Sequence, residues 1–291
     1  MQLRAHRAWT VLWLAIASAP VVGADGLVWA IEGPRNTVYL AGSVHLLRQT
    51  DATLPAAFDR AYADAETILM ELDLDDFDPA QAGRWMLERG VYTDGSTLRE
   101  TLGEPRHRRV AAAANELGLP IEGVQQFEPW AVALTLVELA YARLGFDPES
   151  GVERQIERRA RRDGKEIRGL ETPEEQLGLL DALPLEDQRR FLEQTVEELG
   201  ELEKDTDELL AAWRAGDASR LATMLATEYD EFPSLYRALV TERNARWMPQ
   251  IERLLQDDDD YLIVVGVLHL VGDDGLVALA RRRGLEIERI R

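Results

Sequence analysis

Short apolar runs alternate with longer helical segments along most of the chain, and this alternation limits the fold more than any other feature. Residue type and flanking turn residues predict strands at 27–31, 37–41, 67–74, 165–171, 261–265 and 285–290. Periodicity predicts helices over about 55–66, 79–90, 105–118, 128–145, 149–163, 185–215, 217–228, 233–256 and 274–283. Strands separated by helices predict an α/β fold with a central, mostly parallel sheet and long helical insertions.

The N-terminus differs from the rest of the chain. A short basic region at 1–7 precedes an apolar region at 8–22, and small residues follow. This order is typical of a secretory signal peptide, so residues 1–24 are predicted to be a signal, with cleavage after Ala24. The protein is then exported, to the periplasm or outside the cell. An uncleaved anchor is the alternative, and it would be the chain's only membrane contact.

Composition narrows the class of protein. With 33 Lys and Arg against 53 Asp and Glu, the net charge is −20, which opposes binding to nucleic acid or to an anionic membrane surface. The chain has no cysteine, which excludes a disulfide framework, a thiolate metal site and a cysteine nucleophile. No linker rich in Gly, Pro or Ser divides it, so residues 25–291 are predicted to form a single domain.

Polar residues stand where the predicted strands end. They are His45, Glu71 with Asp73, Glu171, and His269. In an α/β sheet, ligands bind beyond the carboxyl ends of the strands. Imidazole and carboxylate groups suit zinc, manganese, iron or cobalt, and an ion with an open position can activate a water molecule. A further carboxylate could act as a general base.

The two histidines share a local pattern. Each follows a glycine by three positions: Gly42 precedes His45, and Gly266 precedes His269. A glycine there lets the backbone bend or lets a ligand approach closely. One such motif has little meaning, and a single strand-end histidine is usually structural. The pair gains weight because His6 lies in the predicted signal, and His107 lies in a charged segment that we expect to be exposed.

The carboxylates also have simpler interpretations. Glu71 and Asp73 could be a solvated strand exit, and Glu171 could stabilise the start of the following helix through its dipole. That helix start is marked by a capping box of Thr172 and Glu175.

Arg243 and Asn244 add a cation and an amide within a predicted helix. They could orient a substrate carbonyl or stabilise an oxyanion. The alternative is an ordinary amphipathic helix whose apolar face, with Trp247, Met248 and Ile251, lies in the core.

Six motifs in order resemble the TraB/GumN family, which is related to the Tiki proteases. They are "YLAGSVHLL", the "ELD" of 71–73, "GLETPEEQ", "AWRAGD", "ERNARWM" and "VVGVLHLVGDDGL". The resemblance covers about residues 27–290. It implies a fold like that of erythromycin-esterase-like and haem-linked ChaN-like proteins, in which two related halves bring their histidines together. His45 and His269 match the family's hallmark histidines, Glu71 its acidic residue, and Arg243 and Asn244 its Arg-Asn pair.

The resemblance implies a metal-dependent hydrolase, and in Tiki a protease supported by manganese or cobalt. We therefore expect a peptidase acting on a peptide or protein. His45, His269 and Glu71 would hold manganese, cobalt or zinc, Asp73 or Glu171 would serve as second ligand, base or orienting group, and Arg243 and Asn244 would polarise the scissile carbonyl. One alternative is a non-catalytic envelope protein that binds a peptide, pheromone or haem, or assists polysaccharide export. Another is an esterase acting on small molecules.

Overall fold

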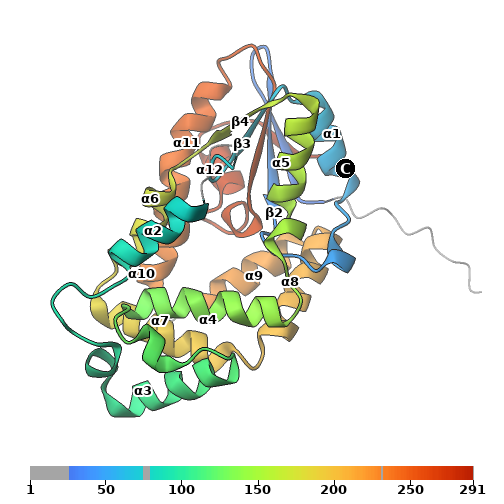
Figure 1. Ribbon diagram of the computed structural model, residues 1–291. Coiled ribbons are helices and arrows are strands. Elements are labelled where there is room, and N and C mark those ends of the chain that lie inside the picture. Colours follow the sequence, from blue (N-terminus) through green and yellow to red (C-terminus); the bar gives the residue numbers. More distant parts are fainter. Residues whose placement is uncertain (1–25, 75–78, 231, 291) are drawn as a thin grey trace, which may run out of the picture.

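A computed structural model describes residues 26–74, 79–230 and 232–290. Its centre is a six-stranded sheet in the order β4-β3-β5-β2-β1-β6 (Figure 1). The strands are β1 (Val28–Glu32), β2 (Thr37–Ser43), β3 (Thr67–Met70), β4 (Glu166–Gly169), β5 (Tyr261–Gly266) and β6 (Ile287–Arg289). The predicted signal segment 1–24 lies outside the described residues.

Strands β2, β5, β3 and β4 run parallel, and β1 pairs antiparallel with both β2 and β6. The prediction of an α/β fold with a mostly parallel sheet is confirmed. Strand β5 lies between β2 and β3, and its six residues are all buried. A strand covered on both faces needs an uninterrupted apolar run, and "YLIVV" supplies one. The predicted edge strand near the C-terminus is β6, beside β1.

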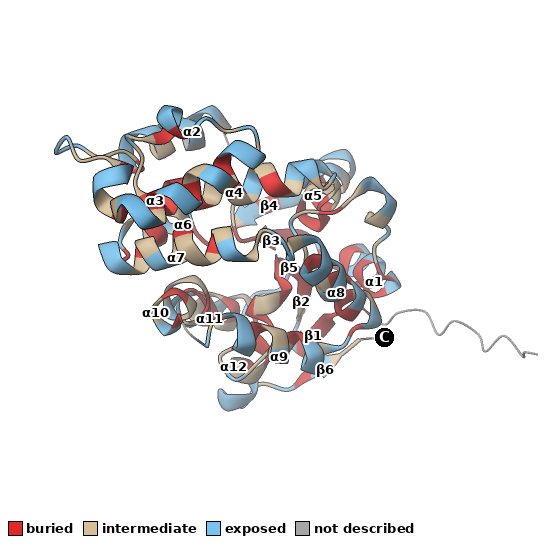
Figure 2. Cartoon of the chain, turned by 90° about the horizontal axis from the view of Figure 1, so that it is seen from below, coloured by how far each residue is buried: buried red, intermediate tan, exposed pale blue. Residues whose placement is uncertain are grey.

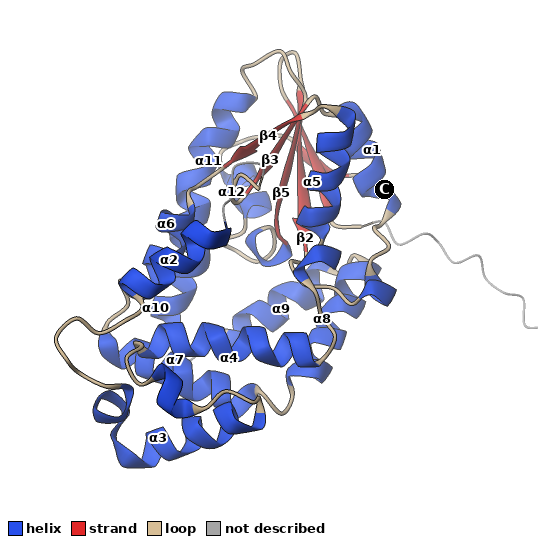
Figure 3. Cartoon of the chain, viewed as in Figure 1, coloured by secondary structure: helices blue, strands red, loops and turns tan. Residues whose placement is uncertain are grey.

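Helices surround the sheet on several sides (Figures 1 and 3). The α-helices are α1 (Ala56–Asp64), α2 (Pro79–Arg89), α3 (Leu98–Glu116), α4 (Pro129–Arg143), α5 (Val152–Asp163), α6 (Pro173–Asp181), α7 (Leu185–Glu198), α8 (Leu202–Ala215), α9 (Ala218–Glu228), α10 (Pro233–Tyr236), α11 (Glu242–Leu254) and α12 (Leu276–Arg282). Short 3-10 turns lie at η1 (Gln49–Asp51), η2 (Ile121–Val124), η3 (Pro148–Ser150) and η5 (Val267–His269), and η4 (Arg237–Thr241) is a π-helical turn.

Helices α1 and α5 cover one face of the sheet, and α11 and α12 cover the other (Figures 1 and 2). Their buried sides face the strands, and their exposed sides face outward, as Figure 2 shows by colour. Helices α3, α4 and α7 pack around a second apolar cluster of their own. Figure 1 places α4, α7, α8 and α9 beyond the carboxyl-end edge of the sheet. The long helical insertions therefore lie next to the residues that follow the strands.

Several predicted helices have different limits in the structure. The predicted helix 105–118 lies within α3, which begins at Leu98 after a capping box of Thr97 and Glu100. Gly103, with a φ of 72°, kinks α3, and the predicted helix corresponds to the part after this kink. The predicted helix 185–215 is two helices, α7 and α8. The segment 233–256 is divided by the π-turn η4, in which the Glu242 N–H donates to the carbonyl of Arg237, five residues earlier. Such π-turns are frequent at functional sites, and this one ends two residues before Arg243.

The expectation that His107 is exposed is wrong. Its side chain is buried in α3, and its Nε2 lies 2.8 Å from Nε2 of Gln125. Burial lowers the pKa of His107 below its usual value, with Arg99 acting in the same direction. The charged residues around His107 occupy the solvated side of the helix, so local composition was a poor guide to the burial of this one side chain. No helix of the described residues is long and apolar enough to cross a membrane.

Gly42 allows the two predicted histidine motifs to pack closely. Its neighbour in space is Val267, and a Cβ atom at position 42 would lie 2.8 Å from Cγ2 of Val267. The Gly42 carbonyl accepts a hydrogen bond of 2.7 Å from Nε1 of buried Trp213. Neither Gly42 nor Gly266 has a positive φ. Close approach, rather than a backbone bend, is therefore what requires glycine at position 42.

Gly42→Ala is expected to lower the free energy of unfolding by about 1–3 kcal/mol, because the added methyl group overpacks the strand end. Urea unfolding measures this change. Gly83→Ala is the control: Gly83 lies in α2, and a methyl group added there would have nothing within 4 Å, so alanine should stabilise by about 0.5–1 kcal/mol. Equal stability of the Gly42→Ala variant and the unaltered protein would contradict this account.

Candidate functional site

The sheet brings the predicted strand-end residues together. His45 follows β2, His269 lies in the turn after β5, Glu71 follows β3, and Glu171 follows β4. Because these four strands are parallel, their carboxyl ends meet at the same edge of the sheet. Nε2 of His45 and Nε2 of His269 each lie 3.9 Å from the same oxygen, Oε1 of Glu71. Residues that are far apart in the sequence thus form one cluster.

Arg243 lies at the buried centre of this cluster. Its Nε donates to Oε1 of Glu171 over 2.9 Å, and its Nη2 donates to Glu171 and to Oε2 of Glu71. Its Nη1 donates to the carbonyl of Leu239 over 3.1 Å and lies 2.9 Å from Nε2 of His269. Its guanidinium also covers the ring of Trp247 at 4.7 Å. The side chain of Arg243 therefore links helix α11 to residues that follow β3, β4 and β5.

Hydrogen bonds define the tautomer of His269. Nδ2 of Asn244 donates to the carbonyls of His269 and Asp274, so Oδ1 of Asn244 is the acceptor facing Nδ1 of His269 at 2.8 Å. Nδ1 therefore carries the proton, and Nε2 presents its lone pair to Arg243 and towards Glu71. Burial lowers the pKa of His269 to about 3, so its imidazole is neutral at physiological pH.

His45 is held differently. Its side chain is 60% exposed, whereas that of His269 is 7% exposed. Nδ1 of His45 lies 2.7 Å from Oε1 of Glu153, a residue of α5, and the Ser43 hydroxyl donates to the same oxygen. The Glu153 carboxylate raises the pKa of His45 to about 9, with Glu71 acting in the same direction and Arg243 against it. Nε2 of His45 is left facing Glu71.

The pKa values of the two glutamates are shifted in opposite directions. Burial alone would raise the pKa of Glu71, but His269, His45, Arg243 and the Gly266 N–H outweigh it and hold that pKa well below its usual value. The N–H of Gly266 donates to Oε1 of Glu71 over 2.7 Å. Burial raises the pKa of Glu171 in spite of its contact with Arg243, and its Oε2 has no hydrogen-bond partner among the described residues.

The donor atoms suit a divalent metal in type. Each imidazole has its Nδ1 held by an oxygen acceptor and its Nε2 directed towards Glu71, which is how metal-ligating histidines are usually oriented. A Cβ atom at Gly266 would lie 3.2 Å from Glu71 Oε1 and 3.2 Å from His45 Nε2, so the missing side chain leaves space beside these donors. As they stand, however, no three histidine, aspartate or glutamate side chains in the described ranges are spaced to hold an ion. In addition, Nη1 of Arg243 already donates a hydrogen bond to the lone pair of His269 Nε2.

Hydrogen bonding also bears on the predicted roles of Arg243 and Asn244. All five N–H groups of Arg243 face the acceptors named above, and both N–H groups of Asn244 are engaged by carbonyls. In this arrangement the two side chains position Glu71, Glu171 and His269. Their predicted contact with a substrate carbonyl stays a prediction. Asp73 is half-buried two residues after Glu71, and its predicted role also stays a prediction.

Glu153 and Gln176 are among the site residues that were not predicted. Glu153 orients His45, and Nε2 of Gln176, in α6, donates to Oε2 of Glu71 over 3.1 Å. A signal for Glu153 does exist in the sequence: Glu153 and Glu157 stand four residues apart beside the apolar stripe of α5, and both are buried. Charged residues at such positions need a partner, and this need marks them as candidates for a site.

The cluster opens into two cavities that share His45. Cavity A, about 260 Å³, is lined by His45, Met70, Glu71, Leu72, Leu74, Pro148, Glu153, Arg154 and Gln176. Cavity B, about 360 Å³, is lined by Val44, His45, Leu46, Tyr141, Glu198, Leu202, Asp205, Thr206, Leu209, Met224, Leu225, Glu228, Tyr229 and Leu268. His45 therefore stands where two solvent-accessible hollows meet.

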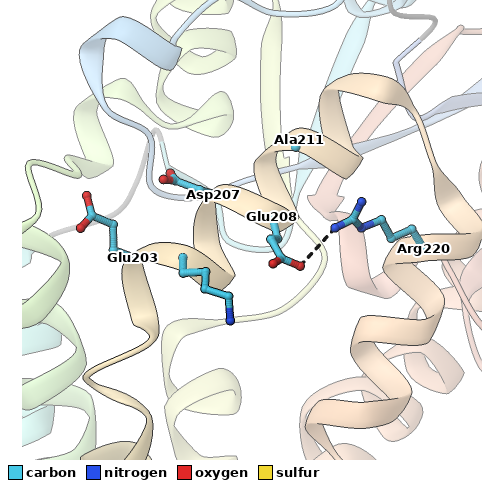
Figure 4. Close-up of a pocket in the computed structure, with 6 residues that line it drawn as sticks. Glu203, Asp207, Glu208, Ala211 and Arg220 are labelled. Atoms are coloured by element: carbon cyan, nitrogen blue, oxygen red, sulfur yellow. Dashed lines mark hydrogen bonds and ion pairs between the residues drawn. The ribbon is translucent and has the colours of Figure 1, made fainter.

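A third depression, on α8 and α9, contains none of the strand-end residues (Figure 4). It is lined by Glu203, Lys204, Asp207, Glu208, Ala211 and Arg220, all exposed. Glu208 pairs with Arg220 at 3.1 Å, as Figure 4 shows. Exposed pairs of this kind stabilise little, and we interpret this depression as ordinary charged surface.

The fold and the site define an α/β protein whose two histidines and two glutamates, from the ends of parallel strands, surround a buried arginine. The sequence model that defines the TraB/PrgY/gumN family matches residues 27–289, and the chain belongs to that family. The resemblance seen in the sequence is confirmed.

Relatives match most of the chain at low identity. The YbaP protein of Shigella flexneri is 23% identical over 251 residues, which cover 86% of this chain and 90% of the relative. YbaP of Escherichia coli (strain K12) is 23% identical over 243 residues, covering 84% and 87%. A protein of Treponema pallidum (strain Nichols) is 24% identical over 283 residues, covering 90% and 82%. No solved structure gives a significant match to the chain.

Arg243→Met is expected to lower the free energy of unfolding at pH 7 by about 3–5 kcal/mol, because it leaves Glu71 and Glu171 buried without their cation. The pKa of Glu171, which burial already raises, then rises further above the unfolded value. The folded variant therefore binds more protons than the unfolded one, and part of the loss should be regained as the pH falls from 7 towards 5. Urea unfolding at both pH values measures this.

Arg246→Met is the matched control. Arg246 lies on the same helix and reaches the same glutamate, with Nη2 3.6 Å from Oε2 of Glu171, but its side chain is 43% exposed. Its loss should cost less than about 1 kcal/mol. If both variants lost equal stability, Arg243 would not be the centre of the cluster.

Proposed function

We propose that the chain is an exported metal-dependent hydrolase that cleaves peptide bonds. The observation that carries this proposal is the convergence of His45 Nε2 and His269 Nε2 on Oε1 of Glu71, each at 3.9 Å. A divalent manganese, cobalt or zinc ion held by these three residues would lower the pKa of a bound water molecule and polarise a carbonyl. Family membership is consistent with such a site, and the activity itself is our inference.

The other side chains would prepare this site. Glu153 and Ser43 would hold the ring of His45, and Asn244 would hold that of His269, so that both Nε2 atoms face the same space. Arg243 would keep the Glu71 carboxylate ionised and in place. Glu171 is the candidate general base, because its Oε2 is free of hydrogen bonds among the described residues. His45 is the residue that incoming substrate would meet, because it lines both cavities.

A non-catalytic binding protein is the second candidate. The observation that favours it is the contact of 2.9 Å between Arg243 Nη1 and His269 Nε2, because the arginine already supplies a cation where a metal would bind. Such a protein would hold a peptide, a pheromone or haem without turnover. Haem binding would produce a Soret band on titration, whereas the hydrolase would show none and would cleave peptides.

The purified protein is expected to bind about one manganese, cobalt or zinc ion and to cleave peptides when the ion is supplied. His45→Ala and His269→Ala should each reduce metal affinity by more than about a hundredfold, since they remove a ligand rather than its support. Metal analysis and isothermal titration measure this. Unaltered metal affinity in both variants would reject the ligand set, and a metal-free, inactive protein under all three ions would reject the proposal.

Glu153→Gln should weaken metal affinity by about ten- to a hundredfold, because the amide supports the imidazole of His45 less strongly than the carboxylate does. Glu157→Gln serves as control on the same helix, because Glu157 is also buried but pairs with Arg154 and Arg161 instead of a histidine. Equal affinities in the two variants would show that Glu153 does not support the site.

A further inference from the structure

Cavity B leads away from His45 and joins a further depression. Cavity C, about 560 Å³, is lined by Arg190, Glu193, Gln194, Glu197, Glu198, Thr227, Glu228, Asp230 and Phe232. Glu198 and Glu228 line both cavities, and His45 lines both A and B. The three cavities therefore adjoin one another in a series that passes His45 of the candidate catalytic cluster. A series of this extent exceeds what a small ester needs and suits an extended chain.

The walls of cavity B are apolar and belong to several elements. Val44 and Leu46 come from the segment after β2, Leu209 from α8, Met224 from α9 and Leu268 from η5. These side chains are half-buried against the main core and leave part of their surface facing outward. Partly exposed apolar side chains that line a hollow are typical of a binding site, because a ligand can remove them from water.

Carboxylates dominate the charge along cavities B and C. Cavity B contains Glu198, Asp205 and Glu228, and none of its described lining residues is a lysine or arginine. Asp205 has a cation at 3.9 Å, the neighbouring Lys204. Within the described part of the chain, no ion pair reaches Glu198 or Glu228. Partial burial and nearby negative charges raise the pKa of both residues above the usual value. Cavity C adds more carboxylates and one arginine.

We infer that cavities B and C form the substrate groove of this protein and take a polypeptide segment that carries both basic and apolar side chains. The apolar walls would receive the apolar side chains, and the carboxylates of Glu198 and Glu228 would receive lysine or arginine. The segment would extend from His45 along α7, α8 and α9. This inference rests on the proposed function in one respect: the bound segment is a substrate because the protein is proposed to be a hydrolase. Haem, whose propionates are anionic, is disfavoured by the same charges.

The test measures binding of fluorescein-labelled peptides of about twelve residues to the purified protein by anisotropy. The first peptide alternates leucine and lysine, the second has serine for leucine, and the third has glutamate for lysine. We expect the first peptide to bind, the second to bind about tenfold more weakly, and the third not to bind. Binding of the first peptide should weaken with added salt, because exposed charges are screened. Equal binding of all three peptides, or of none, would overturn the inference.

A matched pair of variants separates the groove from the overall charge of the protein. Glu198→Gln combined with Glu228→Gln should weaken binding of the leucine–lysine peptide about tenfold. Glu203→Gln combined with Glu208→Gln removes the same charge from the depression of Figure 4 and should weaken it less than twofold. If both double variants weakened binding equally, the peptide would be held by net charge alone, and the groove assignment would be wrong.

Removing metal with a chelator distinguishes this inference from the proposed hydrolase. Peptide binding should survive the chelator, whereas metal-dependent cleavage should stop. Binding without any cleavage under manganese, cobalt or zinc would reject the hydrolase and keep the groove. Metal-dependent cleavage of peptides that is unchanged by Glu198→Gln with Glu228→Gln would keep the hydrolase and reject the groove.

Discussion

The buried guanidinium of Arg243 is the interaction on which the site depends. Its side chain is 6% exposed, and every N–H group of its planar fork has an acceptor. A buried arginine costs much free energy unless it is paired, and two buried carboxylates repel each other unless a cation stands between them. The pairing of Arg243 with Glu71 and Glu171 offsets the cost of burying the guanidinium and places a cation between the two carboxylates. As a consequence, the ends of β3 and β4, the turn after β5 and helix α11 are held in one arrangement.

The two histidines have unequal surroundings although their sequence motifs are alike. His269 is buried beside the ring of Trp247, with the centroids 4.7 Å apart, and its two nitrogens are engaged by Asn244 and Arg243. His45 faces solvent and is held on one side by Glu153. A fixed, neutral imidazole and an accessible one therefore flank the same carboxylate oxygen. This asymmetry gives the cluster an inner side, built for positioning, and an outer side that a ligand can reach.

The helical insertions connect this cluster to a larger surface. Helices α7, α8 and α9 lie beyond the carboxyl ends of the strands and supply most of the walls of cavities B and C (Figure 1). In the sequence, the acidic residues of these helices are most simply interpreted as a solvated face. In the structure, several of them surround the apolar hollow of cavity B. The sheet thus defines where chemistry can occur, and the insertions define what can lie beside it.

The sequence alone determined the α/β class, the order of the main elements and the pairing of His45 with His269, because strand-like runs, capping boxes and motif spacing are local signals. It also pointed to Glu71 and Glu171, since the ends of parallel strands share one edge. The tertiary structure alone decided that Arg243 and Asn244 position the cluster, that Glu153 supports His45, and that His107 is buried. These outcomes depend on which helix packs where. The partners of a side chain can lie far away in the sequence, as with Ser43 and Glu153, which are 110 positions apart, and periodicity does not encode them.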